Sequence, residues 1–250
     1  MYLCENYIFM KTSDFIIFRL NRFPKGYVFT YHDFIVDVDK KDAIIKALNR
    51  LAKTNKIARL SKGKYYKPED SEFGSLKPSL EQSVKDLLEK EDKIIGYLTG
   101  YSIYNKLGLT TQVSNTIQIG RKEMRPAFKR EYYTISFVNQ KNTITKENIP
   151  LLQILDAIRY IKQIPDTTIE SSCKRFVSII ASLSESEQKL LIKLSQKYPP
   201  ATRALIGAIF DELKISDLSE SIFRTLNPIT KYKIPEVAQV LSTAAKWNIQ

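Results

Sequence analysis

The stretch DKKDAIIKALNRLAKTN, Asp39–Asn55, decides the fold expected for this chain, together with the run IARLSKGKYYKP, Ile57–Pro68, that follows it. Apolar residues recur in the first stretch at i, i+3, i+4 and i+7, the spacing of one buried helix face: Ile44, Ala47, Leu48 and Leu51. Asp39 is suited to be the N-cap, and Asp42 lies in the first turn, where the helix dipole favours a carboxylate. The stretch therefore predicts an amphipathic helix with a basic outer face.

The run after this helix predicts a β-hairpin. Residues 57–61 are typical of a short strand, and residues 65–67 of the strand that returns. Lys62-Gly63-Lys64 lies between them, and Gly63 can adopt the positive φ that such a tight turn requires. A basic helix followed directly by a basic hairpin is the order of a winged helix-turn-helix. In that fold the third helix enters the major groove of DNA and the wing contacts the backbone or the minor groove.

The residues upstream complete the same pattern. Lys11–Arg22 has an apolar pattern of helix length, and residues 23–26 interrupt it with a Pro and a Gly. Residues 27–29 favour a short strand, and Thr30 is a good N-cap for a brief helix over residues 31–36. The order of helix, short strand, short helix, basic helix and hairpin is therefore complete by Pro68.

Positive charge is concentrated in this region. The chain has 250 residues and a formal net charge of +12, and residues 11–68 hold 14 Lys or Arg against 5 Asp or Glu. Three-quarters of the net charge thus lies in less than a quarter of the chain. This asymmetry indicates a polyanionic partner for the N-terminal region.

The side chains expected to face DNA belong to the basic helix and the wing: Lys40, Lys41, Lys46, Asn49, Arg50, Lys53, Arg59, Lys62 and Lys64. Asn49 and Arg50 are the candidates for base edges, since amide and guanidinium groups can make bidentate contacts, whereas lysines bind phosphates. The alternative is a solvated basic helix in a winged domain that only mediates protein contact.

The expected fold class is α+β, with an N-terminal winged helix-turn-helix domain over residues 1–77 and a second domain over residues 78–250. Residues 69–77 form a polar connector in this interpretation. The second domain begins as a mixed α/β region, for which we expect a helix at 80–88, strands at 94–98, 115–120 and 132–138, a helix at 101–107 and an exposed basic loop at 121–131. It continues as a helical C-terminus from Ile149, the last helix spanning Pro235–Trp247.

No catalytic motif occurs along the chain. The patterns GxxxxGK[ST], HExxH and GxSxG are absent, so a P-loop enzyme, a zinc protease and a serine hydrolase are unsupported. Cys4 and Cys173 lie far apart without metal-ligand spacing, and His32 is the single histidine. We therefore expect a protein that is not an enzyme and has no catalytic residue, metal or cofactor.

The same features bear on location. Two distant cysteines suggest a reducing compartment, and no apolar run approaches the ~20 residues that span a bilayer. The sequence therefore predicts a cytoplasmic protein without a membrane partner.

Several blocks of the sequence resemble the AbiEi-like family, the antitoxins of type IV abortive-infection toxin–antitoxin systems. The blocks are Phe29-Thr30 with Asp33-Phe34, ALNRL at 47–51, IARLSKGKYYKP at 57–68, and YLTGYSIYNKLGLTTQ at 97–112. The last block is the more specific, because winged helices are common and this tract is not.

The resemblance implies an antitoxin that counters a nucleotidyltransferase-like toxin and binds its own promoter, at inverted repeats, as an autorepressor. In such systems the toxin and antitoxin need not form a stable complex. One alternative is a winged-helix regulator of other genes whose C-terminal domain senses a ligand or dimerises. Another is a DNA-processing enzyme with a winged-helix docking module.

Overall fold

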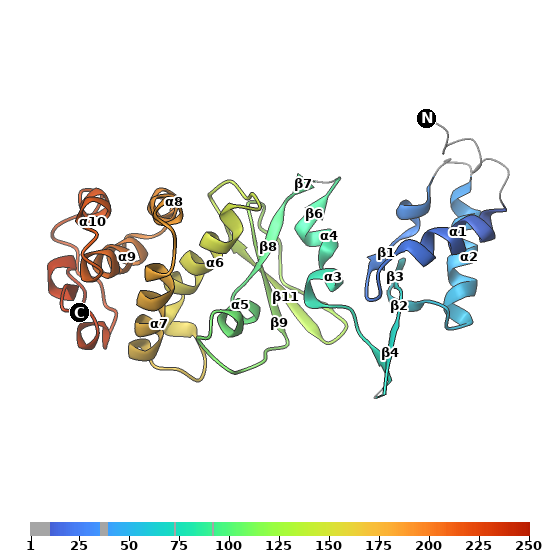
Figure 1. Ribbon diagram of the computed structural model, residues 1–250, viewed down its shortest axis with the longest axis horizontal. Helices are drawn as coiled ribbons and strands as arrows, with labels where there is room; N and C mark the ends of the chain where they lie inside the picture. Colours follow the sequence, from blue (N-terminus) through green and yellow to red (C-terminus); the bar gives the residue numbers. More distant parts are fainter. Residues whose placement is uncertain (1–10, 36–39, 73, 92) are drawn as a thin grey trace. The chain divides into compact units, whose positions relative to one another are not determined.

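The computed structural model describes residues 11–35, 40–72, 74–91 and 93–250 (Figure 1). The chain divides into two compact units, Met1–Asp86 and Leu87–Gln250. The fold is a mixture of helices and strands, and its C-terminal part is helical. The division lies between residues 86 and 87, later than the boundary expected between residues 77 and 78.

The first unit begins with two helices, a 3-10 turn and a three-stranded antiparallel sheet of order β1-β3-β2. These elements are α1 (Thr12–Arg22), β1 (Val28–Phe29), η2 (Tyr31–Phe34), α2 (Lys41–Lys53), β2 (Ala58–Ser61) and β3 (Lys64–Tyr66). The two helices pack on one another, and α2 also contacts η2. The element order expected for residues 11–68 is thus confirmed.

Local chemistry accounts for where these elements start. Thr30 caps η2 through a capping box, in which its hydroxyl accepts from the His32 amide and the Asp33 carboxylate accepts from the Thr30 amide. Lys40 is the N-cap of α2 and makes no side-chain cap bond, while Asp39, the expected N-cap, lies outside the described residues.

The core of the first unit is aromatic and aliphatic. Its buried residues come from both helices, η2 and the sheet: Phe15, Ile16, Leu20, Phe29, Phe34, Ile44, Ala47, Leu48, Leu51, Ile57 and Tyr65. All four residues of the apolar stripe predicted for α2 are among them. Burial of this stripe fixes which face of α2 is left for solvent.

Residues 69–77 differ from the expected polar connector. They form a hairpin of β4 (Glu69–Ser71) and β5 (Gly74–Leu76), in which Gly74 has a φ of 104°. The Ser71 hydroxyl donates to the Gly74 carbonyl at 2.7 Å. The hairpin is mostly exposed and has no apolar alternation, so the usual sequence pattern of a strand is missing here.

The expected helix at 80–88 is two short helices, α3 (Leu80–Ser83) and α4 (Lys85–Leu88). The side chains of Gln82, Lys85 and Asp86 bond to residues 27–64 of the first unit. The Val28 amide donates to Gln82 Oε1 at 3.0 Å, and the Lys85 ammonium donates to the Tyr27 hydroxyl at 2.9 Å. These bonds explain why the first unit extends past residue 77.

The second unit is built on a four-stranded mixed sheet of order β10-β11-β9-β8. Its elements before the C-terminal helices are β6 (Glu89–Lys90), β7 (Lys93–Ile94), β8 (Gly96–Thr99), α5 (Tyr101–Lys106), β9 (Thr116–Arg121), β10 (Phe128–Arg130) and β11 (Tyr133–Asn139). The strands β9 and β11 are parallel neighbours, with Thr116 opposite Thr134.

Residues 121–131 were predicted to be one exposed loop, but they include the end of β9 and the strand β10. Arg121 is buried as the last residue of β9, and residues 128–130 form β10 on the outer edge of β11. Because β10 makes the reversal of direction, β11 runs parallel to β9 and not back along it as in a hairpin.

Helices form the rest of the second unit. They are α6 (Asn148–Arg159), η4 (Ile161–Gln163), α7 (Ile169–Ala181), α8 (Glu185–Ser195), α9 (Pro200–Glu212), α10 (Ser216–Phe223), η5 (Val237–Gln239) and η6 (Ala244–Trp247). Figure 1 shows α6 beside the sheet and α7 to α10 on the side of α6 that faces away from the sheet. In the described part of the chain, no helix combines the length and apolar character that crossing a membrane requires.

The prediction of a helix over Pro235–Trp247 is wrong. The chain there makes only two 3-10 turns, and Glu236 has a left-handed φ of 65°. The hydroxyls of Ser242 and Thr243 bond to Glu212 and to the Ala208 carbonyl of α9. These long-range bonds hold the segment against α9.

Candidate functional site

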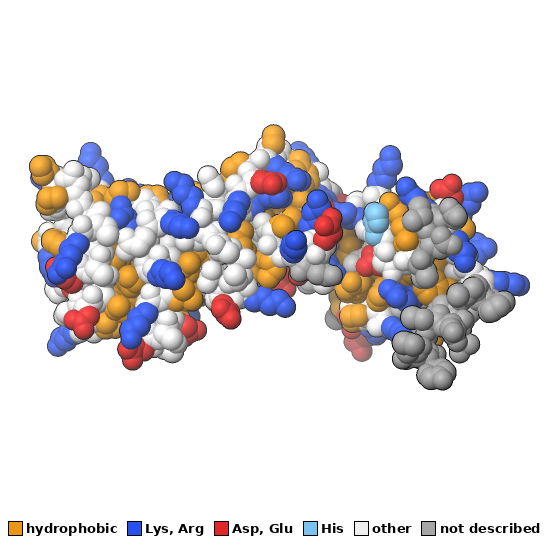
Figure 2. Space-filling model, turned by 90° about the horizontal axis from the view of Figure 1, so that it is seen from above, with side chains coloured by type: hydrophobic (Ala, Val, Ile, Leu, Met, Phe, Trp, Pro, Cys, Tyr) orange, Lys and Arg blue, Asp and Glu red, His pale blue; other side chains and the backbone are white. Residues whose placement is uncertain are grey.

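The outer face of α2 carries three exposed cations. Lys46, Arg50 and Lys53 follow one another at i, i+4 and i+7, so they line one face of the helix, opposite the buried stripe. Lys40 and Lys41 are exposed at the start of the helix, and the Lys41 ammonium lies 5.2 Å from the centre of the Tyr31 ring. Figure 2 shows Lys and Arg side chains spread over the N-terminal unit.

The hairpin of β2 and β3 adds an exposed lysine at its turn. Gly63 has a φ of 75°, as a tight turn of this kind requires, and Lys62 beside it is exposed. The pairing register of β2 and β3 shifts between Arg59 and Ser61. The turn thus presents Lys62 at the tip of the predicted wing.

Asn49 joins the helix to the hairpin. Its Oδ1 accepts a hydrogen bond from Arg59 Nη2 and another from the Tyr65 hydroxyl, both at 2.8 Å. The Arg59 guanidinium also lies 5.6 Å from the centre of the Tyr65 ring. Asn49 and Arg59, both expected to face DNA, therefore have partners within the unit, and a bidentate base contact by Asn49 requires Oδ1 to release them.

Lys64 forms an ion pair and is partly buried, unlike Lys62, although both were predicted to contact DNA from the wing. Its ammonium pairs with the Asp86 carboxylate at 2.6 Å, and its side chain is only 18% exposed. The pair neutralises part of the charge on the wing. Sequence reasoning did not find Tyr65 or Asp86 as partners, because both contacts join segments far apart in the chain.

The structure therefore sorts the nine expected residues into two groups. Six have exposed side chains: Lys40, Lys41, Lys46, Arg50, Lys53 and Lys62. The other three, Asn49, Arg59 and Lys64, bond to groups of the same unit. Within the ranges that the structure describes, no three His, Cys, Asp or Glu side chains are grouped so that they could hold a metal ion.

Residues 16–189 match the model of a family described as "Family of unknown function (DUF6088)". The chain belongs to this family. The match includes α2, the β2–β3 hairpin and the whole sheet of the second unit of this DUF6088 protein, and it ends in α8.

Among solved structures, the DUF6088 chain is similar to the RV2827C protein from Mycobacterium tuberculosis, as seen in its crystal structure. The TM-score is 0.55 at 11% sequence identity, and the alignment covers 88% of this chain and 83% of that chain. At this identity the similarity concerns the fold alone. No curated protein matches the DUF6088 chain.

Proposed function

We propose that this DUF6088 protein binds duplex DNA through its N-terminal unit, which we interpret as a winged helix-turn-helix. The order α1, β1, η2, α2, β2, β3 supports this interpretation, since it places a helix before a hairpin that closes a small sheet. In this fold α2 is the recognition helix and the β2–β3 hairpin is the wing.

The observation that carries the proposal is the row of Lys46, Arg50 and Lys53 on the outer face of α2, with Lys62 at the tip of the wing. Cations arranged in this way neutralise phosphates and release counterions, which is the main source of affinity for DNA. Arg50 is the residue proposed to contact a base edge, because its guanidinium is exposed and can bind guanine bidentately.

We further propose that the protein is a type IV antitoxin and an autorepressor of its own promoter. The support is the resemblance to AbiEi-like antitoxins, which includes the tract YLTGYSIYNKLGLTTQ of the second unit. Its functional partner is then a nucleotidyltransferase-like toxin, countered without any need for a stable complex.

The test of DNA binding is a titration of the full chain with duplex from its own promoter at several salt concentrations. Log affinity should fall with log salt by about 0.9 for each phosphate neutralised. Arg50→Ala and Lys53→Ala should lower affinity, whereas Lys189→Ala, an exposed lysine of α8, is the matched control and should not. Affinity that is indifferent to salt would rule out the proposed mode of binding.

The antitoxin role has its own test. A reading frame for a nucleotidyltransferase-like toxin should lie beside the gene, and its expression should arrest growth unless this protein is co-expressed. Growth arrest that persists with full-length protein present would reject the antitoxin role and leave DNA binding untouched.

A second candidate function is a transcriptional regulator whose second unit senses a small ligand. It is favoured by a cavity of about 360 Å³ within that unit, a size typical of ligand sites. A ligand that changes affinity for promoter DNA would separate this candidate from the antitoxin.

A further inference from the structure

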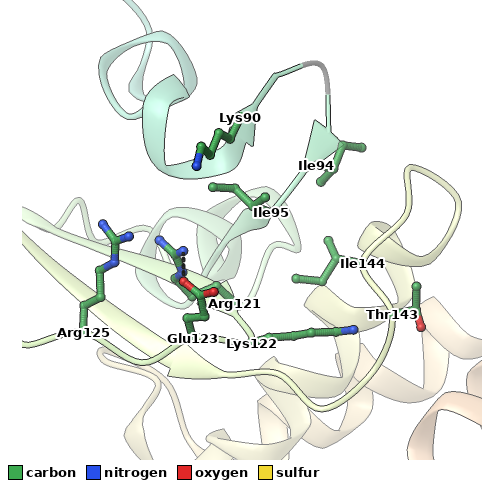
Figure 3. Close-up of a pocket in the computed structure, with 9 residues that line it drawn as sticks. All are labelled: Lys90, Ile94, Ile95, Arg121, Lys122, Glu123, Arg125, Thr143 and Ile144. Atoms are coloured by element: carbon green, nitrogen blue, oxygen red, sulfur yellow. Dashed lines mark hydrogen bonds and ion pairs between the residues drawn. The ribbon is translucent and has the colours of Figure 1, made fainter.

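The second unit contains a basic cavity that the proposed DNA-binding surface does not use. Its volume is about 360 Å³, and its lining residues come from the β6–β7 hairpin, the end of β9 and the loops after β9 and β11. Four of them are cationic, Lys90, Arg121, Lys122 and Arg125, and Glu123 is the one acidic residue among the described residues of the wall. Figure 3 shows the side-chain nitrogens of Lys90, Arg121 and Arg125 on one side of this space.

Arg121 is held at a rigid position. It is the last residue of β9, paired with Gly96 of β8 on one side and with Asn139 of β11 on the other. Its carbonyl also accepts from the Gln140 amide at 2.9 Å. The backbone of Arg121 is thus fixed on both sides, and the side chain that it carries is buried at the cavity wall.

The Arg121 guanidinium is buried without adequate partners. The residue is 3% exposed, and in the described part of the chain neither Nε nor Nη1 has a hydrogen-bond partner. The Phe137 ring, 5.8 Å away, gives partial compensation through a cation–π contact. A buried cation in this state is costly. Because Nε and Nη1 are themselves buried, a ligand recovers that cost only when the neighbouring wall moves to admit it.

Glu123 is a weak partner for this cation. One of its oxygens lies 3.3 Å from Arg121 Nη2, and its side chain is 78% exposed. An exposed contact of this length adds little. Movement of Glu123 would uncover Nη2, and each edge of the guanidinium would then offer two donors to one oxyanion.

We propose that this cavity binds a small phosphorylated molecule, with its phosphate on Arg121 and its apolar part on the opposite wall. A phosphate suits the site better than a single carboxylate, because Lys90 and Arg125 supply two further positive charges on the Arg121 side of the cavity (Figure 3). Ile94, Ile95 and Ile144 provide the apolar wall, and Figure 3 shows Ile94 and Ile144 away from the side-chain nitrogens of Lys90, Arg121 and Arg125. A phosphomonoester whose other part has an apolar face matches this division, and a nucleoside monophosphate, with the flat face of its base, is one such molecule.

The test uses the full chain and three probes in isothermal titration calorimetry: adenosine monophosphate, inorganic phosphate and adenosine. Saturable binding of adenosine monophosphate, weaker binding of inorganic phosphate and none of adenosine are expected. If adenosine bound as tightly as adenosine monophosphate, the assignment would be overturned. It would also be overturned if none of the three probes bound.

Arg121→Met should reduce the affinity for adenosine monophosphate by roughly 10- to 100-fold, the range for loss of hydrogen bonds to a charged group. The same variant should raise the melting temperature of the ligand-free protein, since it removes a buried, poorly partnered charge. A merely structural arginine would have the opposite effect on melting, so a clear fall would overturn the proposal.

Two variants at exposed positions test the site without depending on correct folding of the Arg121 variant. Arg125→Ala lies in the wall of the cavity and should weaken binding, whereas Lys129→Ala removes an exposed charge of β10 that is not in the wall and should not. Equal effects of the two variants would indicate only non-specific attraction and would overturn the proposal. Because the site lies wholly in the second unit, none of these outcomes depends on whether the first unit binds DNA.

Discussion

At the residue scale, Asn49 is the side chain whose interpretation changes most between sequence and structure. Its Oδ1 accepts from both Arg59 and Tyr65, and Tyr65 is 3% exposed. Asn49 therefore fastens α2 to the hairpin, while Arg50, the next residue, is exposed. Neighbours on a helix point in different directions, so Asn49 bonds within the unit while the side chain of Arg50 faces solvent.

We predict that Asn49→Ala lowers the free energy of unfolding by roughly 1–2 kcal/mol, because it removes the acceptor of a buried hydroxyl and of a guanidinium. Arg50→Ala is the matched control and should change stability by less than about 0.5 kcal/mol, as is usual for exposed positions. Urea denaturation of the three proteins gives the comparison. Equal stability of the two variants would show that the Asn49 bonds contribute nothing.

Asp156 is the most buried carboxyl described in the second unit, at 1% exposure. Burial raises its pKa, although hydrogen bonds from Tyr97, Tyr198 and Thr99 act in the opposite direction. These hydroxyls lie 2.7–2.8 Å from its oxygens, and Gln140 in turn donates to both tyrosines. The network links β8 to α6 and to the segment between α8 and α9.

The raised pKa of Asp156 predicts a pH dependence of stability. The folded protein holds the proton more tightly than the unfolded chain, whose carboxyl pKa is about 3.9. Its contribution to stability is therefore complete below that value and is lost as pH rises through the folded pKa. Asp156→Asn does not titrate, so the stability of the natural protein relative to this variant should fall as pH rises above about 4.

Urea unfolding at a series of pH values checks this prediction. Glu147→Gln, at an exposed carboxyl just before α6, is the control for general effects of removing a charge. A difference between the natural protein and Asp156→Asn that stays constant with pH would contradict the raised pKa.

At the element scale, α9 depends on a close approach by the C-terminal segment. The Trp247 side chain is 1% exposed, and its Nε1 donates to Asp211 of α9 at 2.9 Å. A Cβ placed on Gly207 would lie 2.1 Å from Cη2 of the Trp247 ring. A glycine in the middle of a helix weakens it, and here the missing side chain makes room for the indole.

We predict that Gly207→Ala destabilises the protein by about 1–3 kcal/mol, the usual cost of overpacking, although alanine is the better helix former. In a Trp247→Leu background the same change should cost little, because the ring that it meets is gone. Thermal unfolding of the four proteins forms a double-mutant cycle. Equal costs in both backgrounds would mean that the close approach does not matter.

At the scale of the whole molecule, each unit has a hydrophobic core of its own. The core of the first unit holds residues from Phe15 to Tyr65, and the larger core of the second holds residues from Tyr97 to Ile249. A segment with its own core can fold independently. The bonds of Gln82, Lys85 and Asp86 place the end of the first unit near residue 86.

We predict that a fragment of residues 1–86 melts at a higher temperature than a fragment of residues 1–77, because only the longer one keeps these three bonds.

Fragment 1–86 should bind promoter DNA, and fragment 87–250, expressed from a foreign promoter, should relieve growth arrest by the proposed toxin. Relief by the N-terminal fragment alone would mean that control of the toxin is purely transcriptional.

Local sequence was sufficient to predict several features of this protein. The spacing of Ile44, Ala47, Leu48 and Leu51 predicted α2 and its exposed face, and Gly63 predicted the turn of the hairpin, because such signals act between residues close in the chain. The order of elements through residue 66 followed from the same kind of signal.

Only the tertiary structure decided the partners of Asn49 and Lys64, the parallel pairing of β9 and β11, and the burial of Arg121. Each depends on segments distant in sequence that meet in space. In the sequence Arg121 belongs to an apparently exposed basic run, and its burial follows from its position in the central strand β9. The loss of the expected C-terminal helix has the same cause, since Trp247, Ser242 and Thr243 contact α9 and no periodicity within residues 235–247 could reveal that.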